Sequence, residues 1–490
     1  MKGKTYISYS VVAIALLFAL NLSFLEAEER KEEGVGLTIY NGNWAVVKEW
    51  RNIDLKKGLN KIAFQDVAKF IDPTSVSFKS LTDPVGTSVL EQNYEYDLVN
   101  RSKLLEKYID KEITLEREYY DEQKRYVQRK DVKLLSTEGG MVVKDGDEIS
   151  LNPFGNIILP ALPEGLITKP TLVWMINTKK TGRHLSKVTY QTNGIDWNAD
   201  YILVTNKDDT NMDFSAWVTI KNQSGATYKD AQIKLMAGDV QRVSEPQFGL
   251  RRDASYPISG IAKMKEQFSE KAFFEYHLYT LQRPTTLKDN SNKQIELFNP
   301  VSGVPLKKIF VYYGNVDALI WSYGGSAIQD RNYGTTSNKK VDIYLEFLNK
   351  EENRLGIPLP EGRIRVYKKD EADGSLEFVG EDKIDHTPKD EKVLIKLGSA
   401  FDIVGERKQI DFKVNYDRDW MHETFEIKIR NHKKEPVTIL VKEVLYRWIN
   451  WKIENASHKY EKENARTIYF PVTVNQDGEE VITYTVLYTW

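Results

Sequence analysis

The feature that most constrains this fold is an alternation of apolar and polar residues with a period of two, which begins at Leu37 and dominates the chain from there. Residues 37–40 alternate, 41–43 (Asn-Gly-Asn) carry a turn signal, and 44–47 follow as a second apolar-rich run. Successive side chains of a strand point to opposite faces, so such segments bury one face, and Asn-Gly between two of them indicates a hairpin. The pattern predicts a mainly β chain of several antiparallel β-sandwiches with few short helices.

Local signals add three details to this expectation. Lys57-Gly58 separates 53–55 from the alternating residues 59–64 and predicts a second hairpin. A short helix is expected over 102–109, where Ser102 can act as its N-cap. Several short strands with tight glycine turns then follow up to residue 163, and they predict a small SH3-like barrel inserted between the larger β units.

Turn signals and composition divide the chain into segments. We expect a signal peptide at 1–27, an N-terminal β unit at 34–97, a small barrel-like β domain at 98–163, β-sandwich strands at 164–240, a linker or long loop at 241–274, and a C-terminal β-sandwich domain at 275–490. The linker is placed where the alternation stops and proline and glycine gather. Residues 323–338, rich in Gly, Ser and Asn, are expected to form a disordered bulge.

The first 27 residues have the layout of a secretory signal. Lys2 and Lys4 precede an apolar run over 11–20, and Ala27 offers a small residue for cleavage. Residues 6–25 are also long enough to cross a bilayer as an uncleaved anchor. The sequence therefore predicts an exported protein, periplasmic or extracellular, with an inner-membrane anchor as the alternative and no integral membrane domain beyond this leader.

Composition excludes several classes of chemistry. The 490 residues include no cysteine, which excludes disulfides, thiolate metal sites and a cysteine nucleophile, and fits a bacterial envelope better than a eukaryotic secretory route. The 69 basic and 71 acidic residues nearly cancel, so no net field draws the chain to nucleic acid. We expect an envelope protein or a glycan as the partner.

Several phrases of the chain occur in the same order in a known family. They are Asp72-Pro73-Thr74-Ser75-Val76, Leu90-Glu91-Gln92-Asn93-Tyr94, Leu151-Asn152-Pro153, residues 159–163, residues 222–228, residues 356–362 and Asp385-His386-Thr387-Pro388. The chain resembles an exported bacterial family of unknown function, and its C-terminal region resembles domain of unknown function 4139, which is shared with mucoidy-inhibitor A homologues. The resemblance implies an exported, mostly β protein and supplies no catalytic residues.

The densest group of acidic residues and histidine surrounds Asp385-His386, and Glu381, Asp385 and His386 are its candidate ligand or metal residues. Carboxylates and an imidazole can bind a divalent ion or act as acid and base. Asp-His-Thr-Pro is also good turn chemistry, because a residue before proline is pushed into an extended conformation. At these residues the sequence favours a structural turn over a functional site.

Other candidates fail on spacing. Asp209, Asn211 and Asp213 begin like a calcium loop, but Phe214 and Ile220 replace the glycine and the glutamate that the loop requires. Neither a dinucleotide-binding glycine pattern, a Walker loop nor a G-x-S-x-G elbow is present. The sequence predicts no cofactor, no metal and no catalytic residue.

Two aromatic features remain. Tyr446, Trp448 and Trp451 form a candidate aromatic binding surface that could stack on sugar rings if exposed, although core packing is the more common role of such rings in strands. Residues 482–490 alternate and end on an aromatic residue, as the last strand of an outer-membrane barrel does. Charged residues in most other strands favour a closing strand of a sandwich instead.

These observations lead to one expected function and one alternative. We expect a non-catalytic binding or structural β-sandwich module of the cell envelope, which recognises its partner through strands and loops. The alternative is an envelope hydrolase acting on glycan or peptide, centred on Glu381, Asp385 and His386.

Overall fold

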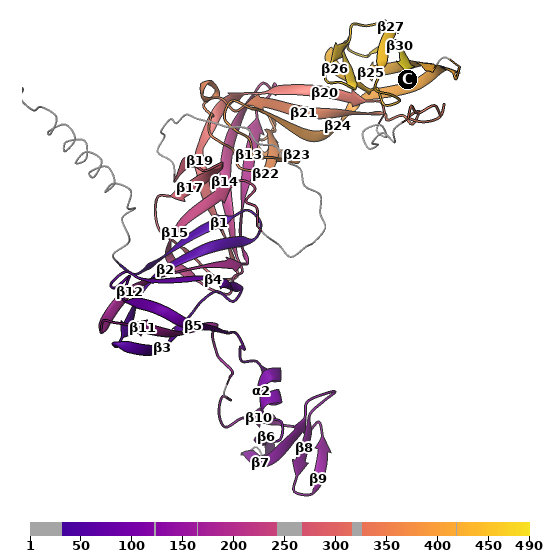
Figure 1. The fold of residues 1–490 in the computed structure, drawn as a ribbon. Coiled ribbons are helices and arrows are strands. Elements are labelled where there is room, and N and C mark those ends of the chain that lie inside the picture. Colours follow the sequence, from indigo (N-terminus) through magenta and orange to yellow (C-terminus); the bar gives the residue numbers. More distant parts are fainter. Residues whose placement is uncertain (1–31, 122–123, 164, 243–266, 316–325, 418) are drawn as a thin grey trace, which may run out of the picture. The chain divides into compact units, whose positions relative to one another are not determined.

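The computed structural model describes residues 32–121, 124–163, 165–242, 267–315, 326–417 and 419–490, and confirms a mainly β chain (Figure 1). The signal peptide predicted at 1–27 lies outside the described residues. The described residues fall into two compact units, one formed by residues up to 196 with 221–235 and 283–292, the other by 197–220, 236–282 and 293–490. No helix in the described part of the chain is long and apolar enough to cross a membrane.

An eight-stranded sheet contains the first predicted hairpin. Its order is β16-β17-β15-β1-β2-β12-β4, with β18 paired to β15. The strands are β1 (Gly34–Tyr40), β2 (Trp44–Leu55), β4 (Ile71–Ser80), β12 (Gly182–Asn193), β15 (Tyr228–Ala237), β16 (Phe268–Phe273), β17 (Tyr276–Leu281) and β18 (Thr285–Leu287). Tyr40 pairs with Trp44 across the turn, where Gly42 and Asn43 take the positive φ angles that this turn requires. The first hairpin is confirmed.

The second predicted hairpin is wrong. β3 (Gly58–Gln65) and β5 (Thr87–Glu95) both pair with β11 (Thr171–Thr178) in a three-stranded sheet of order β3-β11-β5, whereas β2 pairs with β1 and β12. Lys57-Gly58 therefore marks the place where the chain passes from one sheet to another. Gly58 has a φ angle of 95°, so the backbone does bend there, but a turn signal does not specify which strands pair across it.

Residues 98–163 form a separate small sheet of order β10-β6-β7-β8-β9. Its elements are α2 (Arg101–Lys107), β6 (Glu112–Asp121), β7 (Lys124–Ser136), β8 (Val142–Asp145), β9 (Glu148–Leu151) and β10 (Asn156–Ile158). The side chain of Asn100, rather than Ser102, caps the helix, accepting from the Lys103 N–H at 3.0 Å. In the described pairings β10 and β9 are the two edges, so closure into an SH3-like barrel is not confirmed.

A five-stranded sheet of order β19-β14-β13-β22-β23 lies in the second unit. Its strands are β13 (Ile195–Thr205), β14 (Asn211–Asn222), β19 (Ser291–Pro305), β22 (Gly362–Lys369) and β23 (Leu376–Ile384). β13 and β22 run parallel although residues 206–361 separate them, so the sheets are not purely antiparallel as predicted.

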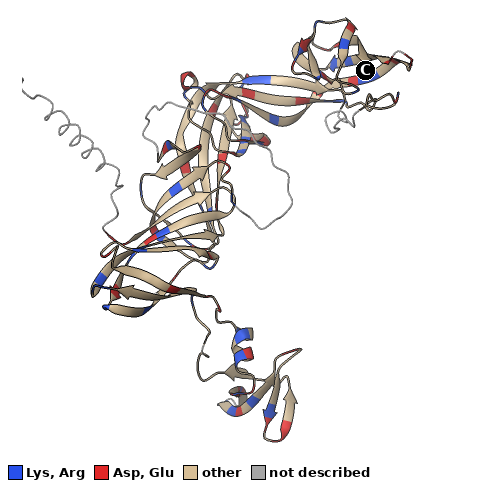
Figure 2. Ribbon diagram, viewed as in Figure 1, with Lys and Arg blue, Asp and Glu red and all other residues tan. Residues whose placement is uncertain are grey.

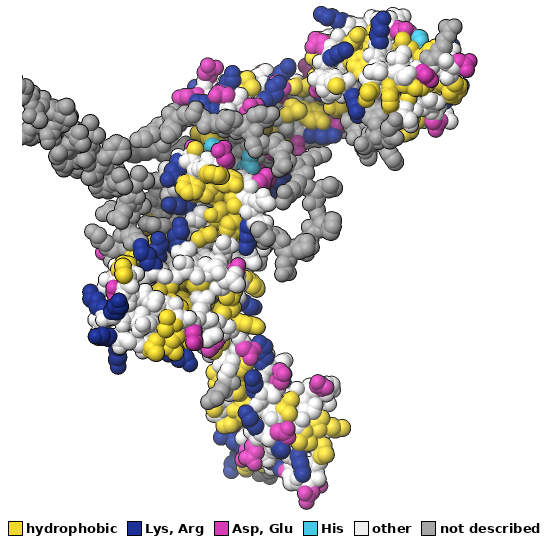
Figure 3. Space-filling model, viewed as in Figure 1, with side chains coloured by type: hydrophobic (Ala, Val, Ile, Leu, Met, Phe, Trp, Pro, Cys, Tyr) yellow, Lys and Arg dark blue, Asp and Glu magenta, His cyan; other side chains and the backbone are white. Residues whose placement is uncertain are grey.

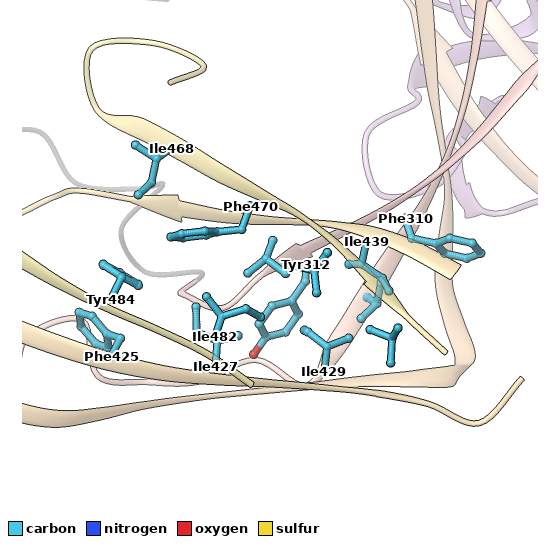
Figure 4. Close-up of a cluster of buried hydrophobic side chains, with 14 of the residues drawn as sticks. Phe310, Tyr312, Phe425, Ile427, Ile429, Ile439, Ile468, Phe470, Ile482 and Tyr484 are labelled. Atoms are coloured by element: carbon cyan, nitrogen blue, oxygen red, sulfur yellow. The ribbon is translucent and has the colours of Figure 1, made fainter. Parts of the chain in front are cut away.

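The C-terminal sheet has nine strands in the order β27-β30-β25-β24-β21-β20-β26-β29-β28. The strands are β20 (Lys307–Tyr313), β21 (Lys340–Leu348), β24 (Lys392–Asn415), β25 (Trp420–Asn431), β26 (Val437–Val444), β27 (Trp451–Ala456), β28 (Glu461–Lys462), β29 (Thr467–Val474) and β30 (Gly478–Thr489), and a 3₁₀ turn, η2 (Glu351–Asn353), follows β21. Inward residues of β20, β25, β26, β29 and β30 fill one apolar cluster, in which Phe425 lies beside Tyr484 (Figure 4).

Two buried ion pairs hold a segment that the sequence predicts to be a disordered bulge. Arg407 pairs with Glu443 at 2.9 Å and Arg447 with Glu423 at 2.8 Å, with side chains no more than 1% exposed. Arg447 also donates to backbone carbonyls of residues 328, 330 and 333, and Arg407 donates to that of residue 334. The described residues 326–338 are therefore held by hydrogen bonds to their backbone carbonyls. Because every residue has a backbone carbonyl, the sequence of the segment does not reveal these contacts.

Candidate functional site

A concave surface with polar lining residues lies on the five-stranded sheet of the second unit. Along β13, the side chains of Trp197, Ala199 and Tyr201 are fully buried, whereas Asn198 and Asp200 point to the other face. β22 lies close against this strand, since a Cβ atom on Gly362 would come within 2.2 Å of the Ala199 carbonyl oxygen. The pairing of Ala199 with Gly362 thereby sets the floor of the site.

A chain of polar contacts crosses all five strands on the outward face. Gln294 donates to Thr219 at 3.3 Å, and Thr219 donates to the Asp200 carboxylate at 2.7 Å. Arg365 then bridges Asp200, at 3.5 Å, and Glu381, at 3.4 Å. We call this series the polar row. It places Glu381, a residue proposed from sequence, beside partners from strands far away in the chain.

The polar row borders a groove of about 590 Å³. Its charged lining residues are Asp200, Glu361, Arg363, Glu381, Asp382 and Lys383. β22 carries basic residues, Arg363 and Arg365 among them, whereas the neighbouring β23 carries Glu381 and Asp382 as well as Lys383; Figure 2 colours basic residues blue and acidic residues red. The groove therefore offers donors and acceptors side by side, with four acidic and two basic residues in its charged lining.

Each carboxylate of the groove already has a partner. Glu361 pairs with Lys383 at 3.1 Å, and Asp382 accepts the backbone N–H groups of Lys396 and Lys383 at 2.7 and 2.8 Å. Asp200 and Glu381 are engaged in the polar row. The arrangement suits the exchange of hydrogen bonds with a polar ligand.

The three residues of the predicted acid–histidine group have different surroundings in the structure. Glu381 lies on β23 and faces Arg363 and Arg365, whereas Asp385 is exposed in the following turn. His386 turns to the neighbouring loop, where its Nδ1 accepts the backbone N–H of Glu361 at 3.0 Å. Within the described residues no three His, Asp or Glu side chains are placed to hold a metal ion. His386 acts here as a backbone acceptor in a turn.

The environment of His386 predicts a pH dependence of stability. Burial lowers the pKa of His386 from the usual 6.5, and a proton on Nδ1 would remove its bond to the Glu361 N–H. The unfolded chain therefore binds this proton at a higher pH than the folded chain does. The stabilisation that His386 provides is complete at pH values above its usual pKa of 6.5. It is lost as the pH falls toward the lowered pKa of the folded chain.

We expect the free energy of unfolding to fall more steeply below about pH 6.5 in the wild type than in His386→Asn. Urea titrations at a series of pH values measure this difference. His432→Asn, at an exposed histidine, is the matched control and should keep the wild-type pH profile. Identical profiles for the wild type and His386→Asn would contradict the assignment.

The predicted aromatic surface is largely taken up by packing. Tyr446 is buried, its hydroxyl donates to the Tyr333 carbonyl at 3.1 Å, and burial raises its pKa well above the usual range. Trp448 is half-buried against the C-terminal core. Trp451 is half-buried too, and its indole N–H donates to the Ala465 carbonyl at 2.9 Å. Tyr446 thus has no free ring face, and sugar stacking stays a prediction for the two tryptophans.

The loop that begins like a calcium site is used differently. The Nζ of Lys308 lies 2.6 Å from one carboxylate oxygen of Asp209, and the Nζ of Lys368 lies 2.6 Å from the other. Burial by itself raises the pKa of Asp209, but the two lysines outweigh it and the net pKa lies below the usual range. Two cations occupy the positions where a calcium ion would need free oxygens.

Sequence reasoning missed Asp200, Thr219, Arg363 and Arg365. Each is an outward-facing polar residue in an alternating strand, and such residues are ordinary on solvated strands. The signal that distinguishes them is their meeting across β14, β13 and β22, and this depends on a parallel pairing between distant segments.

One comparison with known proteins is informative. A family model described as a domain of unknown function (DUF4139) matches residues 186–490, which include every residue of the polar row and the groove. No curated protein matches the chain. The match confirms the predicted resemblance to this domain, whereas the relation to mucoidy-inhibitor A homologues stays a prediction.

Proposed function

This chain belongs to the DUF4139 family, and from that premise and the geometry of the groove we propose that it is an exported, non-catalytic binding module of the bacterial envelope. The recognition surface consists of the polar row and its groove. Both lie within residues 186–490, the part of the chain that the family model matches. The ligand is a polar segment of an envelope protein or glycan, which exchanges hydrogen bonds with the groove.

The observation that carries the proposal is the pairing of all four groove carboxylates with cations, hydroxyl or N–H groups. A glycosidase or acid protease needs one carboxyl group kept protonated, or two poised across a bond. A binding surface needs polar contacts that a ligand can replace at little net cost in free energy. Exposed ion pairs meet this need, because each contributes little to stability.

The leader supports the proposed location. Residues 1–27 have the charge and hydropathy layout of an export signal, and a chain without cysteine needs no oxidative pairing after export. The mass of the purified full-length product tests this part, because cleavage after Ala27 gives a chain that begins at residue 28. A product that retains residue 1 and stays with the inner membrane would support the anchored alternative.

Charge reversal tests the groove. The full chain, immobilised and incubated with envelope extract, should retain a component whose binding the Arg363→Glu, Arg365→Glu variant weakens by about tenfold or more, since charge-assisted hydrogen bonds are lost. The matched control is Lys408→Glu, Lys452→Glu, which changes the net charge equally at exposed positions outside the groove. Equal binding by both variants would refute the role of the groove.

The hydrolase alternative has its own readout. Turnover of an envelope glycan or peptide by the wild type, abolished in Glu381→Gln or His386→Ala, would overturn the non-catalytic proposal. Binding without turnover, lost in the arginine variant, supports it.

A further inference from the structure

The outward face of the five-stranded sheet carries apolar side chains beside the polar row. Trp217 on β14 lies two residues before Thr219, so both side chains point to the same face. Ile202 on β13 follows Asp200 by two residues and shares its face in the same way. Trp217 is 36% exposed and Ile202 is half-buried. Apolar surface therefore reaches the solvent next to the polar row.

Two aromatic residues continue this surface on β22 and β23. Tyr367 follows Arg365 by two residues on β22 and pairs with Phe378 on β23. The two rings meet edge to face with their centroids 5.7 Å apart, and Phe378 is 55% exposed. We call Trp217, Ile202, Tyr367 and Phe378 the apolar band. Hydrophobic side chains also reach the surface of this unit in Figure 3, over the region where Figure 1 labels β14 and β17.

A second groove lies at the other end of this face. Its volume is about 580 Å³, and its lining includes Val204 on β13, Asp213 on β14 and Lys369 on β22. These three side chains point outward, and Val204 pairs with Tyr367 of the apolar band. From Asp200 to Val204 the strand advances roughly 13 Å. The face therefore offers a groove at each end with the apolar band between them, which suits an extended ligand.

A ligand of this face must bind through side chains rather than by adding a strand. In the described sheet, β14, β13 and β22 each have a neighbouring strand on both sides, so their backbone N–H and C=O groups are used within the sheet. A peptide that docks by strand addition needs a free sheet edge. These strands instead present ring faces together with carboxylate, hydroxyl and guanidinium groups.

Charge narrows the choice of ligand. The groove beside the polar row is lined by four acidic and two basic residues, so it does not favour an acidic polymer. A strongly basic ligand would have to compete with the arginine and lysine side chains that already pair with Asp200, Glu381 and Glu361. A neutral ligand that is rich in hydroxyl groups meets neither obstacle.

Sugars combine the two properties that this face requires. A hydroxyl group both donates and accepts hydrogen bonds, so it can bind where donors and acceptors lie side by side. The apolar face of a sugar ring can pack on an exposed aromatic ring. We propose that the groove and the apolar band bind a neutral, linear glycan. This inference rests on the binding function proposed above and names the class of its ligand.

The test uses the full-length protein and three neutral hexasaccharides, cellohexaose, chitohexaose and maltohexaose, with polygalacturonate as an acidic comparison. Titration calorimetry should show that at least one hexasaccharide binds. Its affinity should change little between about 50 and 200 mM salt, because a neutral ligand releases no counterions. Trp217→Ala and Phe378→Ala should each weaken binding about tenfold or more, because each removes a ring from the apolar band.

Two control variants separate the loss of a ring from the loss of the fold. Trp217→Phe keeps a ring at the same position and should retain most of the hexasaccharide binding. Phe401→Ala removes a ring that is 96% exposed on β24, outside the apolar band, and should bind as the wild type does.

Failure of this inference can be told apart from failure of the binding function. The component that the wild type retains from envelope extract should resist protease, and its acid hydrolysis should release mainly sugars. A retained component that protease destroys, and that the Arg363→Glu, Arg365→Glu variant no longer binds, would preserve the role of the groove and overturn the glycan assignment.

Three calorimetric outcomes would also overturn the inference. They are absence of binding to all three hexasaccharides, equal weakening in Trp217→Ala and Phe401→Ala, and tighter binding of polygalacturonate than of any hexasaccharide.

Discussion

Replacing Arg447 with methionine is expected to lower the free energy of unfolding by about 3–5 kcal/mol, because it leaves the charge of Glu423 buried without its partner. Both side chains are fully buried and 2.8 Å apart. The guanidinium also donates to four carbonyls of the 326–338 segment, at 2.7 to 3.4 Å. The change therefore removes a counter-ion and loosens the segment that this arginine holds.

Urea denaturation followed by tryptophan fluorescence measures this effect. Arg430→Met is the matched control, because Arg430 forms partly exposed ion pairs with Glu406 and Glu479 and should cost less than about 1 kcal/mol. The double variant Arg447→Met, Glu423→Met should recover part of the loss, since two apolar side chains leave no unpaired charge. A loss in Arg447→Met no larger than in Arg430→Met would show that the buried pair is not needed.

Replacing Phe425 with alanine, in a separate variant, is expected to lower the free energy of unfolding by about 3–5 kcal/mol. This is the range for removing a fully buried aromatic ring. The ring is 1% exposed and packs against Tyr484 at 5.5 Å between centroids, inside the cluster of Figure 4. The guanidinium of Arg407 lies 3.6 Å above the same ring. A cavity here also removes a cation–π contact from a desolvated arginine.

The measurement is the same denaturation experiment, with two comparison variants. Phe425→Leu retains most of the apolar volume and should cost about 1.5 kcal/mol or less. Phe401→Ala removes a ring that is 96% exposed and should change stability by no more than about 0.5 kcal/mol. Equal losses for the alanine variants at 425 and 401 would contradict the assignment of Phe425 to the core.

Local pattern was sufficient for most strands and for the helix. Residues 37–40 and 44–47 fall in β1 and β2, and the helix predicted over 102–109 is found at Arg101–Lys107. The error in its N-cap has a physical cause. Asn and Ser are nearly equivalent capping residues, and only the position of the helix start decides between Asn100 and Ser102.

Buried asparagines at strand ends show what pattern reading overlooks. Asn222, the last residue of β14, donates its side-chain amide to carbonyls of Ala226 and Lys288, and Asn431, the last residue of β25, does the same to those of Glu435 and Asn475. Both side chains are no more than 1% exposed. An asparagine before a turn predicts an exposed loop, whereas here it joins a turn to a second, distant one.

The sequence by itself determined the class of this protein and the inward face of its strands, because an alternation with a period of two indicates which side chains are buried. Its resemblance to DUF4139 rested on particular phrases of the sequence instead. Only the tertiary structure decided that β3 pairs with β11 rather than with β2, and that β13 lies parallel to β22. The alternation of apolar and polar residues along a strand is the same whichever strand lies beside it. The choice of neighbouring strand rests on contacts between distant segments, and the groove on the five-stranded sheet arises from that choice.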